Sequence, residues 1–149
     1  MPSLFEPARQ AEMLERLSRL HEDARPRWGA MSAAQMLAHL ADHLELSLGE
    51  RRGRPLPGPL RRRAIGWLAL RLLPIPRATL HSAPGVRPSG QHRGFEAERS
   101  RTRVLLLRCV ARLPEEDWGE SPRFGRLPKR DWGILSFRHF DHHLRQFGV

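Results

Sequence analysis

Residues 137–148 have the sequence FRHFDHHLRQFG, in which a HxxxH pair is followed by a glutamine. Because residues four apart lie on one face of a helix, His139 and His143 can present two imidazoles to a single point. Imidazole is the commonest metal ligand in proteins, and its second ring nitrogen allows the protein to orient the ring. The stretch therefore predicts two ligands of a metal site on the last helix of the chain.

Apolar residues at helical spacing predict three further long helices upstream. The first covers about residues 6–22, the second follows Ser32 and ends at Gly49, and the third covers about Glu96 to Leu113. Ser32 and Gln35 have the capping-box spacing, in which each side chain bonds the main-chain N–H of the other residue. The last helix begins near Pro128, a residue favoured in the first helical turn.

The segment between the second and third helices is long. Residues 51–63 are expected to form a loop, residues 64–73 a short helix that ends at Pro74-Ile75-Pro76, and residues 79–94 a turn-rich linker. Strand-like alternation nowhere extends beyond about four residues. The sequence thus predicts an all-α fold, a four-helix bundle with a long crossover between its second and third helices and a short extra helix in that crossover.

The composition is that of one globular domain covering residues 1–149, since 40% of the 149 residues are hydrophobic. The formal net charge of +10 comes almost entirely from arginine, because Lys129 is the only lysine. This charge permits contact with nucleic acid, anionic lipid or acidic metabolites. Nucleic acid is not expected as a partner, because the sequence lacks helix-turn-helix, zinc-finger and RNP-like patterns and has no tyrosine for base stacking.

Cys109 is the only cysteine, so no disulfide can form within the chain, and it lies in an apolar run where an inert, buried thiol is expected. The residues after Met1 contain no apolar run that would serve as a signal peptide, so we expect a cytoplasmic protein. Residues 64–73, the longest apolar stretch, are too few to span a bilayer. Oligomeric state stays open, although the apolar residues from Trp67 to Leu73 are suited to the contact of a homodimer.

A metal in the core of a bundle takes its ligands from facing helices, so the second helix is expected to supply a third ligand. His39 and His43 are the candidates, whereas His21 lies at a helix end and His81 and His92 lie in turn-rich sequence. Three imidazoles leave coordination positions open, as in catalytic metal sites. Histidines four apart also occur by chance on exposed helices, so spacing alone leaves both interpretations open.

Two segments resemble the DinB/YfiT-like superfamily, and within it a branch of unknown function. They are residues 28–40, WGAMSAAQMLAHL, and residues 124–147, which hold Phe124-Gly125, Trp132 and the HxxxHxxQ ending. The resemblance covers nearly the whole chain and implies a four-helix bundle that holds a divalent metal, commonly zinc or nickel. Carried over position by position, the ligands are His39, His139 and His143.

The resemblance leaves the neighbouring polar residues with less certain roles. His43 falls outside the motif and is expected on the polar face rather than behind a ligand, and His142 is expected in solvent or at a pocket rim. Gln146 has two open roles, a hydrogen bond to a ligand imidazole and packing at the helix end. Ser121 stands before Pro122, where relatives often have a histidine, which puts a substrate-binding role of that position in doubt.

Some relatives resemble metal-dependent transferases or isomerases that act with low-molecular-weight thiols such as bacillithiol, mycothiol or glutathione. The resemblance thus implies a thiol-dependent or hydrolytic enzyme acting on a small-molecule substrate, in which the ion lowers the pKa of a bound thiol or water. Arg138 and Arg145 are candidates for holding the carboxylates of such a thiol, although a solvated charge on the helix surface is the commoner role of a single arginine in so basic a chain. Asp141 is expected to be exposed or salt-bridged. The alternative is a non-catalytic binding module whose basic surface contacts an anionic partner or nucleic acid, so enzyme activity stays open.

Overall fold

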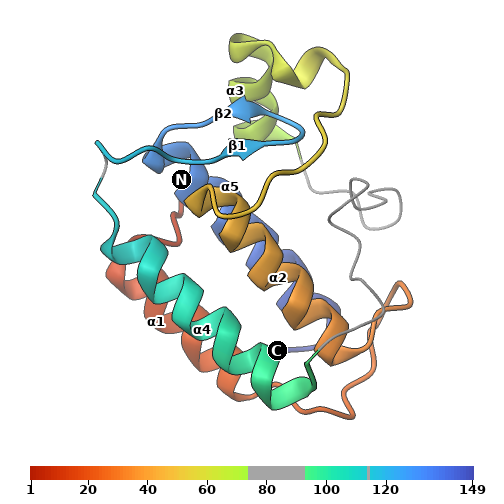
Figure 1. The fold of residues 1–149 in the computed structure, drawn as a ribbon. Coiled ribbons are helices and arrows are strands. Elements are labelled where there is room, and N and C mark those ends of the chain that lie inside the picture. Colours follow the sequence, from red (N-terminus) through yellow and green to blue (C-terminus); the bar gives the residue numbers. More distant parts are fainter. Residues whose placement is uncertain (74–92, 114) are drawn as a thin grey trace.

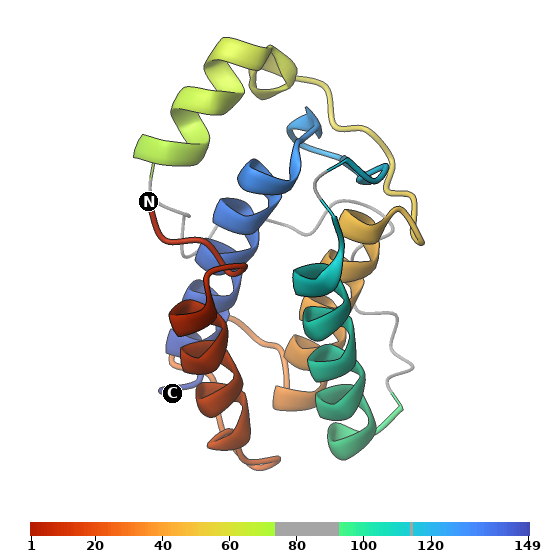
Figure 2. The same cartoon turned by 90° about the vertical axis from the view of Figure 1, so that its left-hand side faces the viewer.

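The computed structural model describes residues 1–73, 93–113 and 115–149. Its elements are the helices α1 (Pro7–Ser18), α2 (Ala33–Leu48), α3 (Arg63–Leu72), α4 (Phe95–Ala111) and α5 (Lys129–Gln146), the short 3-10 helix η1 (Pro59–Arg61), and the strands β1 (Glu120–Ser121) and β2 (Gly125–Arg126). Helices α1, α2, α4 and α5 form the bundle, and α3 lies at one end of it beside the strands (Figures 1 and 2). The predicted all-α bundle with a short helix in its crossover is confirmed.

Helix α2 has well-defined ends because its sequence supplies both caps. The Ser32 hydroxyl accepts a hydrogen bond from the Gln35 main-chain N–H at 3.2 Å, and Gln35 Oε1 accepts one from the Ser32 N–H at 2.9 Å. At the other end Gly49 adopts a left-handed conformation with φ of 76°, which a residue with a side chain rarely adopts. The capping box and the helix end at Gly49 are both as predicted, and they fix the position of α2 residues along the bundle.

One apolar cluster joins the four bundle helices. Its fully buried members include Met13, Met36, Leu40, Leu44, Leu106, Phe140 and Leu144. Cys109 of α4 lies in the same cluster with no exposed surface, and burial raises the pKa of its thiol to about 11. The prediction of a buried thiol is therefore confirmed, and the raised pKa disfavours the reactive thiolate.

The strands tie the end of α2 to the beginning of α5. They pair antiparallel, with Glu120 opposite Arg126 and Ser121 opposite Gly125. Just before them the Gly119 N–H donates to the Ser47 carbonyl at 2.8 Å, and a Cβ on Gly119 would lie only 1.8 Å from the Leu46 carbonyl oxygen. The Trp132 indole N–H donates to the Gly119 carbonyl at 3.1 Å. A glycine is thus required where this segment touches both bundle helices.

The helix bounds differ from the predictions by a few residues. The first helix ends at Ser18 and α4 at Ala111, each earlier than the apolar pattern predicts, while α3 begins one residue earlier, at Arg63. Pro74-Ile75-Pro76 and residues 79–92 of the predicted linker lie outside the described residues. Within the described ranges no helix has both the length and the hydrophobicity that a membrane crossing requires.

Candidate metal centre

Three histidines from two facing helices come together in the bundle. His39 lies on α2, and His139 and His143 lie one turn apart on α5. One ring nitrogen from each lies within 4.8 Å of those of the other two, and the Nε2 atoms of His39 and His139 are 3.0 Å apart. Tetrahedral zinc with bonds of about 2.0 to 2.1 Å places two nitrogen ligands about 3.3 Å from each other. The His39–His139 distance is therefore close to that of two ligands on one ion, and all three predicted ligands lie near enough together to be candidates for one metal site.

Gln146 determines which nitrogen of His143 carries the proton. The Gln146 amide nitrogen donates to the Trp28 carbonyl at 2.5 Å, so its Oε1 faces the other way and accepts from His143 Nδ1 at 2.9 Å. Since an amide oxygen can only accept, Nδ1 is protonated and Nε2 keeps a free lone pair. A hydrogen bond of this kind commonly orients imidazoles that bind metals. Of the two predicted roles for Gln146, the structure shows the hydrogen bond to an imidazole.

His43 differs from its predicted position on the polar face, and that prediction is wrong. The side chain is buried, its Nε2 lies 2.9 Å from the Ser136 hydroxyl, and its ring stacks on His139 with centroids 4.5 Å apart and planes 14° apart. The edge of the ring meets Trp132, which is also buried. Because Ser136 engages Nε2, His43 supports the ring of His139 instead of adding a fourth nitrogen to the group.

Burial keeps these imidazoles neutral. The pKa of His143 falls from 6.5 to about 3, first through burial and then through the neighbouring His39. The same two causes lower the pKa of His43 to about 3, and burial followed by four neighbouring imidazoles lowers that of His139 well below 6.5. A neutral imidazole is the form that binds a metal. His139 and His143 are therefore in their ligand form at neutral pH.

His142 lies at the edge of the group, as a pocket-rim residue would. Its side chain is half-buried, and its ring contacts the rings of His143 and Trp28 at centroid distances of 5.0 and 5.7 Å. Trp28 thus contributes both a ring beside His142 and the carbonyl that orients Gln146. The Trp28–Gly29 segment before α2 is in this way connected to the last turns of α5.

The two arginines proposed as substrate carboxylate holders are used elsewhere. Arg138 donates to the carbonyls of Leu70 and Leu73 and so connects α5 to the end of α3. The exposed Arg145 pairs with Asp141 at 3.0 Å, and Asp141 also pairs with Arg16 at 2.9 Å. The expectation of a salt-bridged Asp141 is confirmed. The role suggested for Arg138 and Arg145 is not supported, because the contacts of both guanidinium groups lie outside the three-histidine group.

Ser121, the position where relatives often carry a histidine, lies in strand β1. Its side chain is buried, and its hydroxyl accepts a hydrogen bond from the Phe124 N–H at 3.3 Å. Two contributors to the site were not predicted. Ser136 precedes His139 by three residues on one helix face, so its spacing carries a signal, whereas the Trp28 carbonyl is a main-chain group that no residue type reveals.

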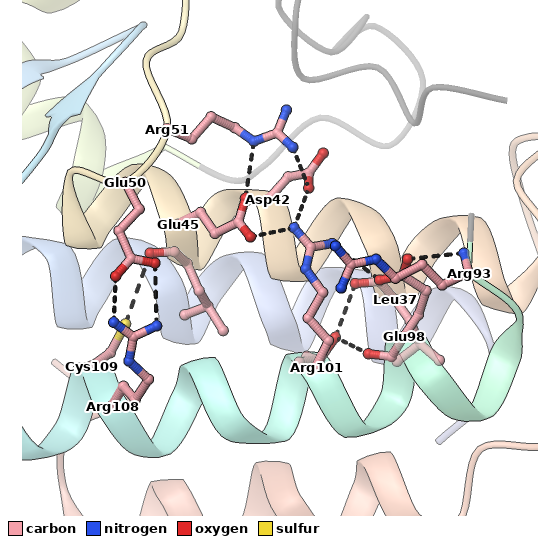
Figure 3. Close-up of polar contacts among 12 residues, drawn as sticks. Leu37, Asp42, Glu45, Glu50, Arg51, Arg93, Glu98, Arg101, Arg108 and Cys109 are labelled. Carbon is pink, nitrogen blue, oxygen red and sulfur yellow. Dashed lines mark hydrogen bonds and ion pairs between the residues drawn. The ribbon is translucent and has the colours of Figure 1, made fainter. Parts of the chain in front are cut away.

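A second polar cluster occupies the face of α2 that packs on α4 (Figure 3). Arg101 of α4 reaches Asp42 at 2.9 Å, Glu45 at 2.5 Å and Glu98 at 3.1 Å, and Arg51 reaches Asp42 and Glu45 at 3.0 and 3.2 Å. We name these five residues the ionic network. Although burial raises the pKa of Glu45, the hydrogen bonds and charges of Arg101 and Arg51 lower it overall. The network is thus a set of charges that compensate one another.

Fold and site together define a helical bundle whose core carries a group of three histidines able to hold a metal ion. The chain belongs to the DinB superfamily, because the sequence profile with that description matches residues 5–147. The resemblance predicted from the two sequence segments is thereby confirmed. Comparison with curated proteins and with solved structures gives no match.

Proposed function

We propose that the protein is a metal-dependent enzyme in which His39, His139 and His143 hold a divalent cation, zinc or nickel. The observation that carries this proposal is the hydrogen bond from His143 Nδ1 to Gln146, which leaves the Nε2 lone pair of His143 free within a group of three imidazoles whose ligand nitrogens lie within 4.8 Å of one another. Three nitrogen ligands leave coordination positions open for a substrate. A cation bound there lowers the pKa of a coordinated thiol or water and polarises an electrophile.

The reaction class we propose is transfer or isomerisation with a low-molecular-weight thiol, or else hydrolysis. The chain itself supplies no sulfur nucleophile, because Cys109 is fully buried and burial raises its pKa to about 11. A thiol that reacts at this site therefore comes from the substrate. The side chains of His39 and His143 are buried, and the rings of His142 and Trp28 pack against each other at the edge of the group. The proposed compartment is the reducing cytoplasm, where such thiols are kept reduced.

Metal content tests the first half of the proposal. Tag-free protein soaked with zinc or nickel and then desalted is expected to retain about one ion per chain by elemental analysis. His139→Ala and His143→Ala remove ligands and are expected to retain none. His21→Ala is the matched control, because that imidazole is exposed and does not belong to the three-histidine group. Equal metal content in all four proteins would overturn the proposed site.

Thiol binding tests the second half. Zinc-loaded protein is expected to show a higher melting temperature with glutathione, mycothiol or bacillithiol, because a ligand that binds only the folded state stabilises it. S-methylglutathione, which has no ionisable sulfur, is expected to give no shift. The shift should also disappear in His139→Ala. If S-methylglutathione stabilises the protein as well as glutathione does, the thiol does not contact the metal and the proposed chemistry is wrong.

A second candidate is a non-catalytic binding module for an anionic partner. The observation that favours it is the exposure of arginines such as Arg25, Arg52, Arg54 and Arg103. A salt-sensitive gel shift with nucleic acid, together with full metal loading and no response to thiols, would favour this function over an enzyme.

We also propose a homodimer through α3, whose Ile65, Leu68 and Leu72 side chains are exposed. Exposed apolar clusters of this kind often mark protein contacts. Light scattering is expected to give the mass of two chains, and Leu68→Arg to give the mass of one. A monomeric wild-type protein would contradict the proposal.

A further inference from the structure

A cleft lies at the end of the bundle where α3, the two strands and the first turn of α5 meet. Figures 1 and 2 show these three elements side by side, with α3 above the strands. The cleft has a volume of about 480 Å³, within the range of about 300 to 1,000 Å³ that small-molecule sites occupy. Its lining does not include His39, His139 or His143, so it is separate from the proposed metal centre.

The lining of the cleft is strongly cationic. Five arginines contribute to it, together with two carboxylates, Glu120 and Asp131; the arginines are Arg61, Arg63, Arg71, Arg126 and Arg130. Each carboxylate already pairs with one arginine, since Arg61 binds Glu120 and Arg71 binds Asp131 at 2.7 Å. Both of these pairs are internal to the cleft and leave its remaining cations uncompensated.

Arg63, Arg126 and Arg130 are the remaining cations. All three are exposed, and their guanidinium groups form no hydrogen bond or ion pair within residues 1–73, 93–113 and 115–149. Arg63 belongs to the first turn of α3, Arg126 to β2 and Arg130 to the first turn of α5. Three separate elements therefore bring an unpaired guanidinium to one concave surface, where low-dielectric walls concentrate the positive potential.

The fixed part of the cleft is held in place before any ligand binds. Arg61 donates to the Pro122 carbonyl at 2.9 Å, which attaches η1 to the turn between β1 and β2. The Arg71 guanidinium lies 4.4 Å from the centre of the Trp67 ring while it pairs with Asp131 of α5. Trp67 nevertheless keeps 52% of its surface exposed. The cleft thus combines an exposed indole with guanidinium groups that have no partner among the described residues.

We propose that this cleft binds a small organic phosphate, whose anionic group is held by Arg63, Arg126 and Arg130 and whose organic part packs on Trp67. A phosphate ester carries between one and two negative charges at neutral pH and offers several acceptor oxygens, which match more than one guanidinium. Arginine binds phosphate with two parallel hydrogen bonds, a geometry that lysine cannot reproduce. The binding is independent of metal at the three histidines.

Titration calorimetry with pyrophosphate, ADP and adenosine tests the proposal. Pyrophosphate tests the anionic half of the site, and ADP adds a flat organic group able to stack on an indole. The wild-type protein is expected to bind pyrophosphate, to bind ADP more tightly, and to bind adenosine not at all. Binding of adenosine as tight as that of ADP, or no binding of either phosphate, would overturn the proposal.

A matched pair of double variants distinguishes the cleft from the general basic surface. The double variant Arg63→Gln with Arg130→Gln is expected to bind ADP at least about tenfold more weakly, because two charge-assisted interactions are lost. Arg25→Gln with Arg103→Gln removes the same charge from exposed, unpaired arginines outside the cleft and is expected to change the affinity by less than about twofold at 150 mM salt. If the affinity for ADP fell equally in both double variants, the binding would depend on net charge alone and the proposed site in the cleft would be wrong.

Trp67→Ala supplies a second readout. It is expected to remove most of the advantage of ADP over pyrophosphate while leaving pyrophosphate binding within about twofold. Melting temperatures of all variants establish that they are folded, and Arg126→Gln replaces the double variant if that protein fails to fold. If Trp67→Ala still bound ADP more tightly than pyrophosphate by the wild-type factor, the organic part of the ligand would not pack on Trp67.

Discussion

Helix α2 has polar side chains on two faces that pack against other helices, and the two faces avoid uncompensated buried charge in different ways. Towards α4, the ionic network places Asp42 and Glu45 against Arg51 and Arg101, so each charge has an opposite charge at hydrogen-bond distance. Towards α5, His39 meets further imidazoles, which burial keeps neutral. The first face is complete as it stands. The second gathers lone pairs that a cation would satisfy, and this difference identifies the face suited to a ligand.

The largest expected effect concerns pH. Below pH 6.5 the unfolded chain protonates His43, His139 and His143, whereas burial holds their pKa values in the folded state near 3 or well below 6.5. The unfolded state then binds more protons, so stability falls as the pH falls from 6.5 towards 3. Each imidazole contributes about 1.4 kcal/mol per pH unit, or roughly 4 kcal/mol for three between pH 7.5 and 5.5. Urea unfolding in the presence of a chelator measures this loss.

Between pH 7.5 and 5.5 the change in stability is expected to come from the histidines of α2 and α5 and not from Glu45. The pKa of Glu45 is lowered from 4.5, so the stability that this carboxylate contributes is present above pH 4.5 and is lost as the pH falls further. His43→Gln is expected to remove about a third of the loss between pH 7.5 and 5.5. His21→Gln, at an exposed position, is the control. Equal unfolding free energies at the two pH values would show that the imidazoles are not buried.

The next largest effect is expected from a substitution in the ionic network. Arg101→Met leaves Asp42, Glu45 and Glu98 with less compensation, and we expect a loss of about 3 kcal/mol in the free energy of unfolding, the lower end of the range for a buried pair. Arg108→Met on the same helix is the control. Its side chain is 51% exposed against 16% for Arg101, and its pair with Glu50 contributes at most about 1 kcal/mol. Similar losses in the two variants would mean that the network is no more than a surface feature.

A smaller effect is expected from Gln146→Leu, which keeps the volume and removes the hydrogen bond that orients His143. Loss of such a partner typically weakens metal binding about 10- to 100-fold. Competition with a chromophoric chelator measures the zinc affinity. In Ser136→Ala, which removes the partner of His43, the affinity should change less than in Gln146→Leu. The reverse order would make His43 a ligand and Gln146 a packing residue.

The smallest expected effect concerns the Cys109 thiol of α4 and tests whether it can react in the folded protein. Cys109 lies against Ser47, with Sγ 3.3 Å from the Ser47 hydroxyl, and burial raises its pKa. Native protein at pH 8 is therefore expected not to react with a thiol reagent over an hour, and to react fully in urea. Rapid labelling of the folded protein would place a reactive thiol in the bundle and reopen the choice of nucleophile.

The sequence predicted those parts of the fold that depend on local chemistry. The capping box at Ser32 and the glycine end at Gly49 fix α2 without help from the rest of the chain, and the HxxxH spacing places His139 and His143 on one face whatever surrounds them. The grouping of His39 with this pair is confirmed, although the choice of His39 over His43 came from the family resemblance. That these histidines bind a metal stays a prediction.

The errors came from tertiary contacts. His43 lies 40° from His39 around an ideal helix, and only the position of Ser136 on α5 decides that it is buried and engaged. Arg138 was considered free to bind substrate, but the carbonyls at the end of α3 occupy it, and nothing in the residues around Arg138 indicates where α3 lies. Spacing along one helix carries information about a face, and not about what that face meets.

His39 and His139 lie 100 positions apart in the chain. A cation held by both would close a loop of that length, and constraints that close long loops remove the most entropy from the unfolded chain, by up to about 4.7 kcal/mol when the link is covalent. A chain with one cysteine cannot form such a link by oxidation. Separation of α2 from α5 would then have to wait for a ligand to dissociate, so occupancy of the three histidines would set the lifetime of the folded protein.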